Sequence, residues 1–402
     1  MAESIERAKE SRRREQRVVV TPSPENSETP LDSLSGWVTP NRLFFVRNHF
    51  DPPEIDESAW RLRIEGLVER AIALSLDDLL DLPQRSVFAT VECAGNGRSF
   101  LTPKVHGVQW GAGAIGHAEW TGVPLHVVLE RAGVKPGTVD VLFEGADVGT
   151  EADHSEPMHF VRSLPLEKAL APDTLLVTRM NGELLETAHG APLRLFVPGW
   201  YGVASVKWLM RIEALDHAYR GYYQSKKYTI RRRTPDGEET VVVGPMPVKS
   251  EIVRPKEDAE LGVGAVRIFG AAWAGEQAVA SVEVTVDGGA SWQAAELLGA
   301  PAPYSWVLWE YLWDVVEPGR YSLAARAADD AGRMQPEQHD DLCGGYHIAF
   351  VRYRGVIVTS EATSSAQAGD FEALLFDMNA YVEESSHTPL DVELEFTLGA
   401  GI

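Results

Sequence analysis

Residues Thr90–Ser99 read TVECAGNGRS, and this stretch contains Cys93, one of only two cysteines among 402 residues. The cysteine stands where an apolar run, Val87–Ala89, gives way to the glycine-containing segment Ala94–Arg98. Glycine lets the backbone take positive φ and approach a ligand closely. A thiolate at neutral pH needs a nearby positive charge, which Arg98 offers, or a soft metal. The alternative is that Cys93 is a small buried apolar side chain, which is the commoner fate of a free cysteine.

Three other segments carry cationic side chains next to apolar residues: LFFVRNH at Leu43–His49, HGAPLR at His189–Arg194 and GVASVKWL at Gly202–Leu209. Together with ECAGNGRS at Glu92–Ser99, and in this order along the chain, they resemble the sulfite oxidase family of mononuclear molybdenum enzymes. The resemblance is to the haem-free form that carries a C-terminal dimerisation domain. It covers roughly residues 39–355 and fades at both ends of the chain.

The resemblance implies one molybdenum per chain, held by a single molybdopterin and by the thiolate of Cys93. An anionic phosphate favours arginine, lysine and backbone N–H groups as partners. The residues that match the family's cofactor positions are Phe45, Val46, Arg47, Asn48, His49, Asp147, His189, Arg194, Ser205, Val206 and Lys207. Taken alone, Arg194 would be expected in an ion pair on a strand and Lys207 in solvent. Their motif context favours the cofactor instead.

The substrate that the resemblance implies is a small oxyanion, sulfite, which several guanidinium groups would hold through charge-assisted hydrogen bonds. Arg47, Arg98, Trp110 and Tyr228 match the family's substrate-pocket positions. Sulfite-oxidising members supply another arginine from the second domain, near a Gln-Pro motif.

This chain keeps Gln335-Pro336 but diverges over the rest of residues 335–356. Arg352 or Arg354 could supply the missing arginine, or no residue does. Three residues of this region, His339, Cys343 and His347, have a spacing that fits no zinc pattern, so we expect no second metal there.

The formal net charge of −22 argues against nonspecific nucleic-acid binding, which needs a basic face. No apolar run approaches the roughly 18–20 residues of a membrane span. Arg12–Arg14 resembles a twin-arginine export signal, but no apolar core of about 7–15 residues follows it. We therefore expect a cytoplasmic protein. The two distant cysteines exclude a disulfide framework and a Cys-x-x-Cys-His haem attachment, so we expect no haem.

Four regions are predicted along the chain. Residues 1–35 are charged and Pro/Ser/Glu-rich, which is typical of a disordered arm. Residues 36–250 mix short strands and short helices, which predicts an α+β molybdopterin-binding domain. One helix is expected to begin after Ser75, and a second is expected to end at Gly133. Residues 251–355 contain short strands at the spacing of an immunoglobulin-like β-sandwich. Residues 356–402 show helical and then alternating spacing and form an extension of unknown role.

The family's second domain mediates dimerisation, so we expect a homodimer. Without haem, electrons must leave to an external acceptor, such as a cytochrome, dioxygen or another carrier. The leading prediction is therefore a molybdenum enzyme that oxidises sulfite to sulfate. One alternative is a reductase of nitrate or an S-oxide on the same scaffold. Another is an inactive two-domain assembly protein, which the presence of Cys93 and Arg98 disfavours.

Overall fold

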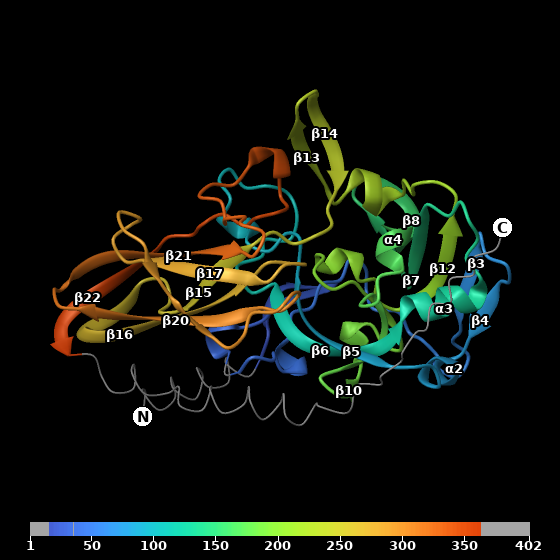
Figure 1. Cartoon of the computed structure of the whole chain (residues 1–402), viewed down its shortest axis with the longest axis horizontal. Coiled ribbons are helices and arrows are strands. Elements are labelled where there is room, and N and C mark those ends of the chain that lie inside the picture. The colour runs from blue at the N-terminus through green and yellow to red at the C-terminus, as the bar shows by residue number, and fades with distance from the viewer. Residues whose placement is uncertain (1–15, 35, 363–402) are drawn as a thin grey trace, which may run out of the picture.

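The computed structural model describes residues 16–34 and 36–362. Figure 1 shows two bodies side by side along the longest axis of the molecule. Residues 36–242 form most of one body, which we call the first domain, and residues 249–362 form the other, the second domain. A hairpin of residues 229–242 projects from the first domain near the junction of the two.

Two five-stranded sheets make up most of the first domain. One runs in the order β10 (Glu183–Leu184), β9 (Leu175–Met180), β6 (Ile115–Pro124) and β5 (Arg85–Glu92), with β11 (Arg194–Phe196) paired to β9. The other runs in the order β4 (Ile72–Leu74), β3 (Leu62–Gly66), β12 (Leu209–Leu215), β7 (Asp140–Glu151) and β8 (His154–Pro165). Strands β3 and β12 are parallel, so the chain must cross between them, and the other pairs are antiparallel.

Three short helices lie beside these sheets: α2 (Leu76–Leu80), α3 (Leu125–Ala132) and α4 (Leu166–Ala169). The two predicted helix boundaries are confirmed. Ser75 and Asp78 form a reciprocal capping box at the start of α2, which satisfies two backbone N–H groups. Helix α3 ends at Gly133, whose φ of 72° lies in the left-handed region that glycine adopts without strain.

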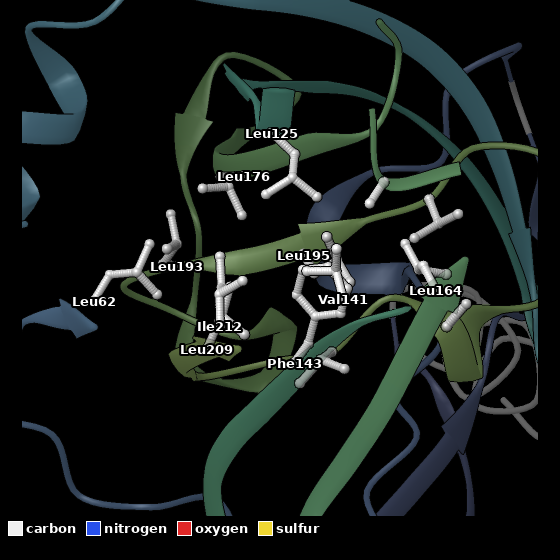
Figure 2. Close-up of a cluster of buried hydrophobic side chains, with 14 of the residues drawn as sticks. Leu62, Leu125, Val141, Phe143, Leu164, Leu176, Leu193, Leu195, Leu209 and Ile212 are labelled. Carbon is white, nitrogen blue, oxygen red and sulfur yellow. The ribbon is translucent and has the colours of Figure 1, made fainter. Parts of the chain in front are cut away.

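The main core of the first domain lies between its two sheets. Figure 2 shows leucine, valine, isoleucine and phenylalanine side chains from both sheets pointing toward one another, with Leu125 of α3 among them. Phe143 of β7, Leu195 of β11 and Ile212 of β12 are fully buried there. This core fixes the ends of the strands from which the site residues emerge.

The second domain contains an eight-stranded sheet. Its order is β18 (Gln293–Ala294), β17 (Val279–Thr285), β21 (Gly319–Asp329), β22 (Arg354–Ala362), β16 (Ala259–Trp273), β20 (Val307–Val315) and β19 (Glu296–Leu298), with β15 (Lys249–Arg254) paired to β16. Gly288 and Gly289 both take positive φ in the turn between β17 and β18, a conformation that glycine adopts without strain. Trp309 is completely buried in the core of this domain.

The predicted disorder of residues 1–35 is wrong for residues 16–34. Strands β1 (Val18–Pro22) and β2 (Glu25–Glu28) form a hairpin. Ser27 and Val46 then exchange two backbone hydrogen bonds of 2.9 and 2.8 Å, which tie this hairpin to the first domain. The segment is ordered mainly by backbone pairing and buried polar contacts, with Leu34 buried in an apolar cluster, so its composition did not reveal it. Residues 1–15 lie outside the described residues.

The predicted boundary at residue 355 is also too early. Strand β22 continues to Ala362 and pairs with both β16 and β21, and its Val356 and Val358 are buried in the core of the second domain. The remainder of the predicted extension, residues 363–402, lies outside the described residues.

The polar stretch after Tyr228 forms the hairpin of β13 (Thr229–Thr234) and β14 (Gly237–Val242), with Gly237 at positive φ in its turn. Figure 1 shows it projecting from the first domain, and its Arg233 pairs with Asp340 of the second domain at 3.0 Å. Within residues 16–34 and 36–362, no helix is long and apolar enough to cross a membrane.

Candidate active site

Cys93 lies in the tight turn that follows β5. Its backbone N–H donates to Ala114 O at 2.9 Å, and its carbonyl accepts from the Asn96 N–H at 2.8 Å. Gly97 then takes a φ of 90°, which favours glycine, before the short 3-10 helix η3 (Arg98–Phe100) begins. The turn places the Cys93 thiol and the Arg98 guanidinium beside the same hollow.

Two adjoining hollows meet at Cys93. The inner cavity lies within the first domain, and the outer cleft, of about 610 Å³, opens toward the second domain. Five residues line both: Arg47, Asn48, His49, Cys93 and Tyr228. The cleft is within the size range of small-molecule sites in proteins.

The inner cavity has a surplus of cationic groups. Arg47, Arg194 and Lys207 face one carboxylate, Asp147. Burial lowers the pKa of Arg194 to about 10, and burial with the charge of Arg194 holds the pKa of Lys207 well below its usual value. Burial raises the pKa of Asp147 to about 6, although Lys207 opposes this. These shifts reflect charges held out of water, and an anion in the cavity would stabilise the two cations, Arg194 and Lys207.

The hydrogen bonds of these cations go largely to neutral oxygen atoms. Lys207 Nζ donates to Ala188 O at 2.9 Å and to the side-chain oxygen of Asn48. Arg194 donates only a long bond of 3.4 Å to His189 O, and its buried Nε has no hydrogen-bond partner among the described residues. An unpaired buried N–H is costly, so the cavity is suited to a ligand with phosphate-like oxygens.

His49 and Tyr228 form a neutral pair at the junction of the two hollows. Their Nε2 and hydroxyl atoms lie 2.6 Å apart, and the His49 ring stacks on Phe160 with centroids 4.6 Å apart. Burial, followed by the charges of Arg47, Lys207 and Arg162, holds the pKa of His49 well below its usual value. Burial raises the pKa of Tyr228 to about 12. The pair therefore offers one shared hydrogen bond and no net charge.

Arg98 lines the outer cleft together with two other cations, Arg47 and Lys227. It donates to Val108 O at 2.9 Å and to Gly345 O at 3.2 and 2.9 Å, so its hydrogen bonds also go to neutral oxygens. Trp110 is completely buried, lines the same cleft, and has an indole N–H without a partner among the described residues. Burial raises the pKa of the Cys93 thiol, while Arg47 and Arg98 act to lower it.

Most residues predicted for the site come together there. Those that line one or both hollows are Phe45, Arg47, Asn48, His49, Cys93, Arg98, Trp110, Asp147, His189, Arg194, Ser205, Lys207 and Tyr228. Val46 and Val206 do not line them. The Val206 side chain packs in the main core, and Val46 pairs with Ser27 through its backbone, so a cofactor contact of these two residues stays a prediction.

Neither candidate for an additional arginine reaches the site. Arg354 donates to Pro255 O and Ile252 O, both at 2.7 Å, and Arg352 lies over the Phe100 ring near Glu251. In the described part of the chain, no three His, Cys, Asp or Glu side chains are arranged to hold a metal ion, and this includes His339, Cys343 and His347.

Sequence reasoning missed several residues of the site. Asn26, from the segment predicted to be disordered, accepts from Arg47 at 3.2 Å and from the Asn48 N–H at 3.0 Å. Tyr346 and Gly345 reach the cleft from the second domain. Nothing in the local sequence marks Asn26. The glycine pair before Tyr346, inside the diverged region, was the available signal for the second-domain loop.

Comparison with known proteins agrees with this arrangement. Residues 49–223 match the family model of the oxidoreductase molybdopterin binding domain, and residues 240–351 match that of the Mo-co oxidoreductase dimerisation domain. The structure is similar to that of the sulfane dehydrogenase SoxCD from Paracoccus pantotrophus, with a TM-score of 0.75 and 32% identity, over 85% of this chain and 88% of that one.

Curated relatives include both sulfite oxidases and nitrate reductases. The chain is 37% identical to the mitochondrial sulfite oxidase of Drosophila melanogaster, over 82% of this chain and 62% of the relative. It is 34% identical to the sulfite oxidase of Gallus gallus, over 78% and 72%, and 32% identical to an NADH nitrate reductase of Solanum lycopersicum, over 78% and 38%. The chain thus spans about 60% of the length of the mitochondrial sulfite oxidases that it matches. It belongs to the sulfite oxidase family of molybdenum enzymes.

Proposed function

We propose that this protein is a molybdopterin-dependent oxidoreductase that oxidises sulfite to sulfate and passes the electrons to an external acceptor. The observation that carries the proposal is the convergence of Cys93, Arg47 and Arg98 on one cleft, with both guanidinium groups hydrogen-bonded to neutral oxygens. Their positive charge therefore stays available to an anion, in a protein whose net charge is −22.

The residues of the inner cavity fit the implied cofactor. Cys93 would ligate molybdenum, while Arg194, Lys207, His189 and Ser205 would hold the pterin and its phosphate. The partnerless Nε of Arg194 supports this assignment, since a phosphate oxygen would satisfy it. When bound, the cofactor supplies the two-electron redox change and the oxygen transfer.

The chain's own residues would bind and orient the substrate. Arg47 and Arg98 hold the sulfite oxygens, and the Trp110 ring closes one wall of the cleft. The Tyr228 hydroxyl, fixed by His49 at 2.6 Å, offers a neutral hydrogen bond beside the cysteine. The net reaction takes sulfite and one water to sulfate, two protons and two electrons, and the electrons leave one at a time to the acceptor.

We further propose a homodimer with one molybdenum per chain, formed through the second domain as an immunoglobulin-like sandwich. The match to a dimerisation domain supports it, and so do two large apolar side chains that this domain exposes, Leu312 at 67% and Val316 at 76%. The absence of haem, the cytoplasmic location and the identity of the acceptor stay predictions.

The alternative on the same scaffold is reduction of nitrate or an S-oxide. The nitrate reductase relative favours it, and so does the placement of Arg352 and Arg354 outside the cleft. Purified, molybdenum-loaded protein should be assayed with sulfite and an artificial electron acceptor, and with nitrate and an artificial donor. We expect sulfite oxidation. Turnover of nitrate or a sulfoxide without any turnover of sulfite would replace the proposed substrate.

A matched pair of variants tests the role of Arg98. Arg98→Met should lower kcat/KM for sulfite by about one to two powers of ten, since a charge-assisted contact contributes roughly 1.5–3 kcal/mol. Arg232→Met, on the exposed hairpin, is the control and should keep normal kinetics. Equal kcat/KM values for sulfite in the two variants would contradict the proposed role of Arg98 in substrate binding.

A further inference from the structure

One loop of the second domain extends to the outer cleft. It contains the 3-10 helix η7 (Asp341–Cys343), whose first turn is capped by Asp340. Arg233 of the projecting hairpin pairs with Asp340 at 3.0 Å, so the loop is anchored beside that hairpin, as Figure 1 shows. Tyr346 at its end donates its N–H to Cys343 O at 3.1 Å and lines the cleft.

This loop provides most of the hydrogen bonds that hold Arg98. Both Nε and one terminal nitrogen of the guanidinium donate to Gly345 O, at 3.2 and 2.9 Å, across 247 positions of the chain. The other terminal nitrogen donates to Val108 O at 2.9 Å. The orientation of this planar cation is therefore fixed by both domains together.

Three glycines leave the space that the guanidinium occupies. A Cβ on Gly95 would lie 2.3 Å from a terminal nitrogen of Arg98, and one on Gly107 would lie 2.6 Å from the other. A Cβ on Gly345 would lie 3.0 Å from Nε. Gly345 does not have the positive φ that favours glycine, so alanine there fits the backbone, and its Cβ presses on the guanidinium and, at 3.2 Å, on Val105 Cγ2.

Tyr346 contacts both groups that face the substrate. Its ring centroid lies 5.6 Å from the Arg98 guanidinium carbon, within cation–π range, and 5.0 Å from the ring of Tyr228. Its hydroxyl accepts the Tyr228 backbone N–H at 3.3 Å. Tyr228 has a φ of 53°, a conformation that side-chain-bearing residues rarely adopt, so this contact helps to hold a strained residue in place.

We propose that Gly345 and Tyr346 are positioning residues that fix Arg98 and Tyr228 for the anionic substrate, so that the second domain contributes to substrate affinity without placing an arginine in the cleft. The proposal rests on the proposed function for the identity of the anion. Through these contacts, a change in the loop at residues 340–347 alters binding of the anion in the first domain.

The test combines kinetics with binding of sulfate, the product, to the molybdenum-loaded protein. In Gly345→Ala and Tyr346→Ala, KM for sulfite and Kd for sulfate, measured by titration calorimetry, should both rise roughly 3- to 10-fold, because small displacements of an oriented group are costly. The kcat value should stay within about twofold. Tyr346→Phe keeps the ring beside Arg98 but loses the hydroxyl contact to Tyr228, so its affinity should lie between those of the wild type and Tyr346→Ala. Gly319→Ala, where a Cβ meets only an ordinary 3.6 Å contact, is the control.

The outcomes separate this inference from the proposed function. Unchanged sulfate affinity in both loop variants, alongside a loss in Arg98→Met, overturns the inference and leaves the proposed function intact. Wild-type protein that binds sulfate normally but does not oxidise sulfite overturns the proposed function, and the loop variants still test the inference through sulfate affinity. Wild-type protein that binds no sulfate overturns both.

Discussion

Replacing Lys249 by methionine should strongly destabilise the protein, because it breaks a buried ion pair directly behind the candidate metal ligand. Lys249 Nζ of β15 lies 2.9 Å from Glu92 Oε1, and both side chains are only 2% exposed. The same carboxylate accepts from Asn96 Nδ2 and from Trp273 Nε1, each at 3.0 Å. Glu92 immediately precedes Cys93, so the network connects the cysteine turn to the second domain.

The size of the effect follows from what remains after the change. Removing one partner of a buried ion pair costs about 3–5 kcal/mol, since the other charge is left in a medium of low polarity. The Asn96 and Trp273 donors still contact Glu92 in the variant, so we expect the lower end, about 3 kcal/mol. The double variant Glu92→Gln with Lys249→Met removes both charges and should be less destabilised than Lys249→Met alone.

Urea unfolding followed by tryptophan fluorescence and circular dichroism measures these losses. Arg232→Met is a matched control, because its pair with Glu239 is largely exposed and such pairs contribute about 0–1 kcal/mol. A loss in Lys249→Met no larger than in Arg232→Met would refute the reasoning. So would a double variant less stable than Lys249→Met.

Two further predictions concern pH and assembly. Burial lowers the pKa of His117 to about 3, so the folded protein keeps it neutral while the unfolded chain protonates it near pH 6.5. The contribution of His117 to the unfolding free energy should therefore fall by about 1.4 kcal/mol per pH unit as the pH drops from about 6.5 toward 3. His117→Phe should reduce the pH slope of that free energy by about one proton, and an unchanged slope would contradict this. For assembly, light scattering should give the molar mass of a dimer for the wild-type protein. A stable dimer interface should bury at least ~1,200 Å² in total. The double variant Leu312→Glu with Val316→Glu should be monomeric. The control Leu184→Glu, on the exposed surface of the first domain, should stay dimeric. A monomeric wild-type protein would contradict the proposed dimer.

The parts of the fold that sequence predicted are those determined locally. The cap at Ser75 and the end of a helix at Gly133 depend on a few adjacent residues, so their patterns are visible in the chain itself. The site residues in the short motifs, such as Cys93 and Arg98, could be predicted in the same way, because each motif carries several of them.

What sequence did not predict depends on contacts between distant positions. The bonds of Arg98 to Gly345 span 247 positions and that of Glu92 to Lys249 spans 157, and no periodicity or spacing indicates such pairs. Asn26 was missed because a polar segment can be ordered by hydrogen bonds without an apolar pattern. The burial of the Val206 side chain in the core was not foreseen, because a motif match does not tell which side chains of a segment face the core.

Molybdenum-edge X-ray absorption of the wild-type protein and of Cys93→Ser tests the central claim most directly. Protein made in a host that synthesises molybdopterin should contain about one molybdenum per chain, with the Cys93 thiolate among its sulfur ligands. In Cys93→Ser, the metal that remains should have one sulfur ligand fewer, and sulfite oxidation should be lost. The same number of sulfur ligands in both proteins, with unchanged molybdenum content and activity, would contradict the assignment of Cys93 as the metal ligand.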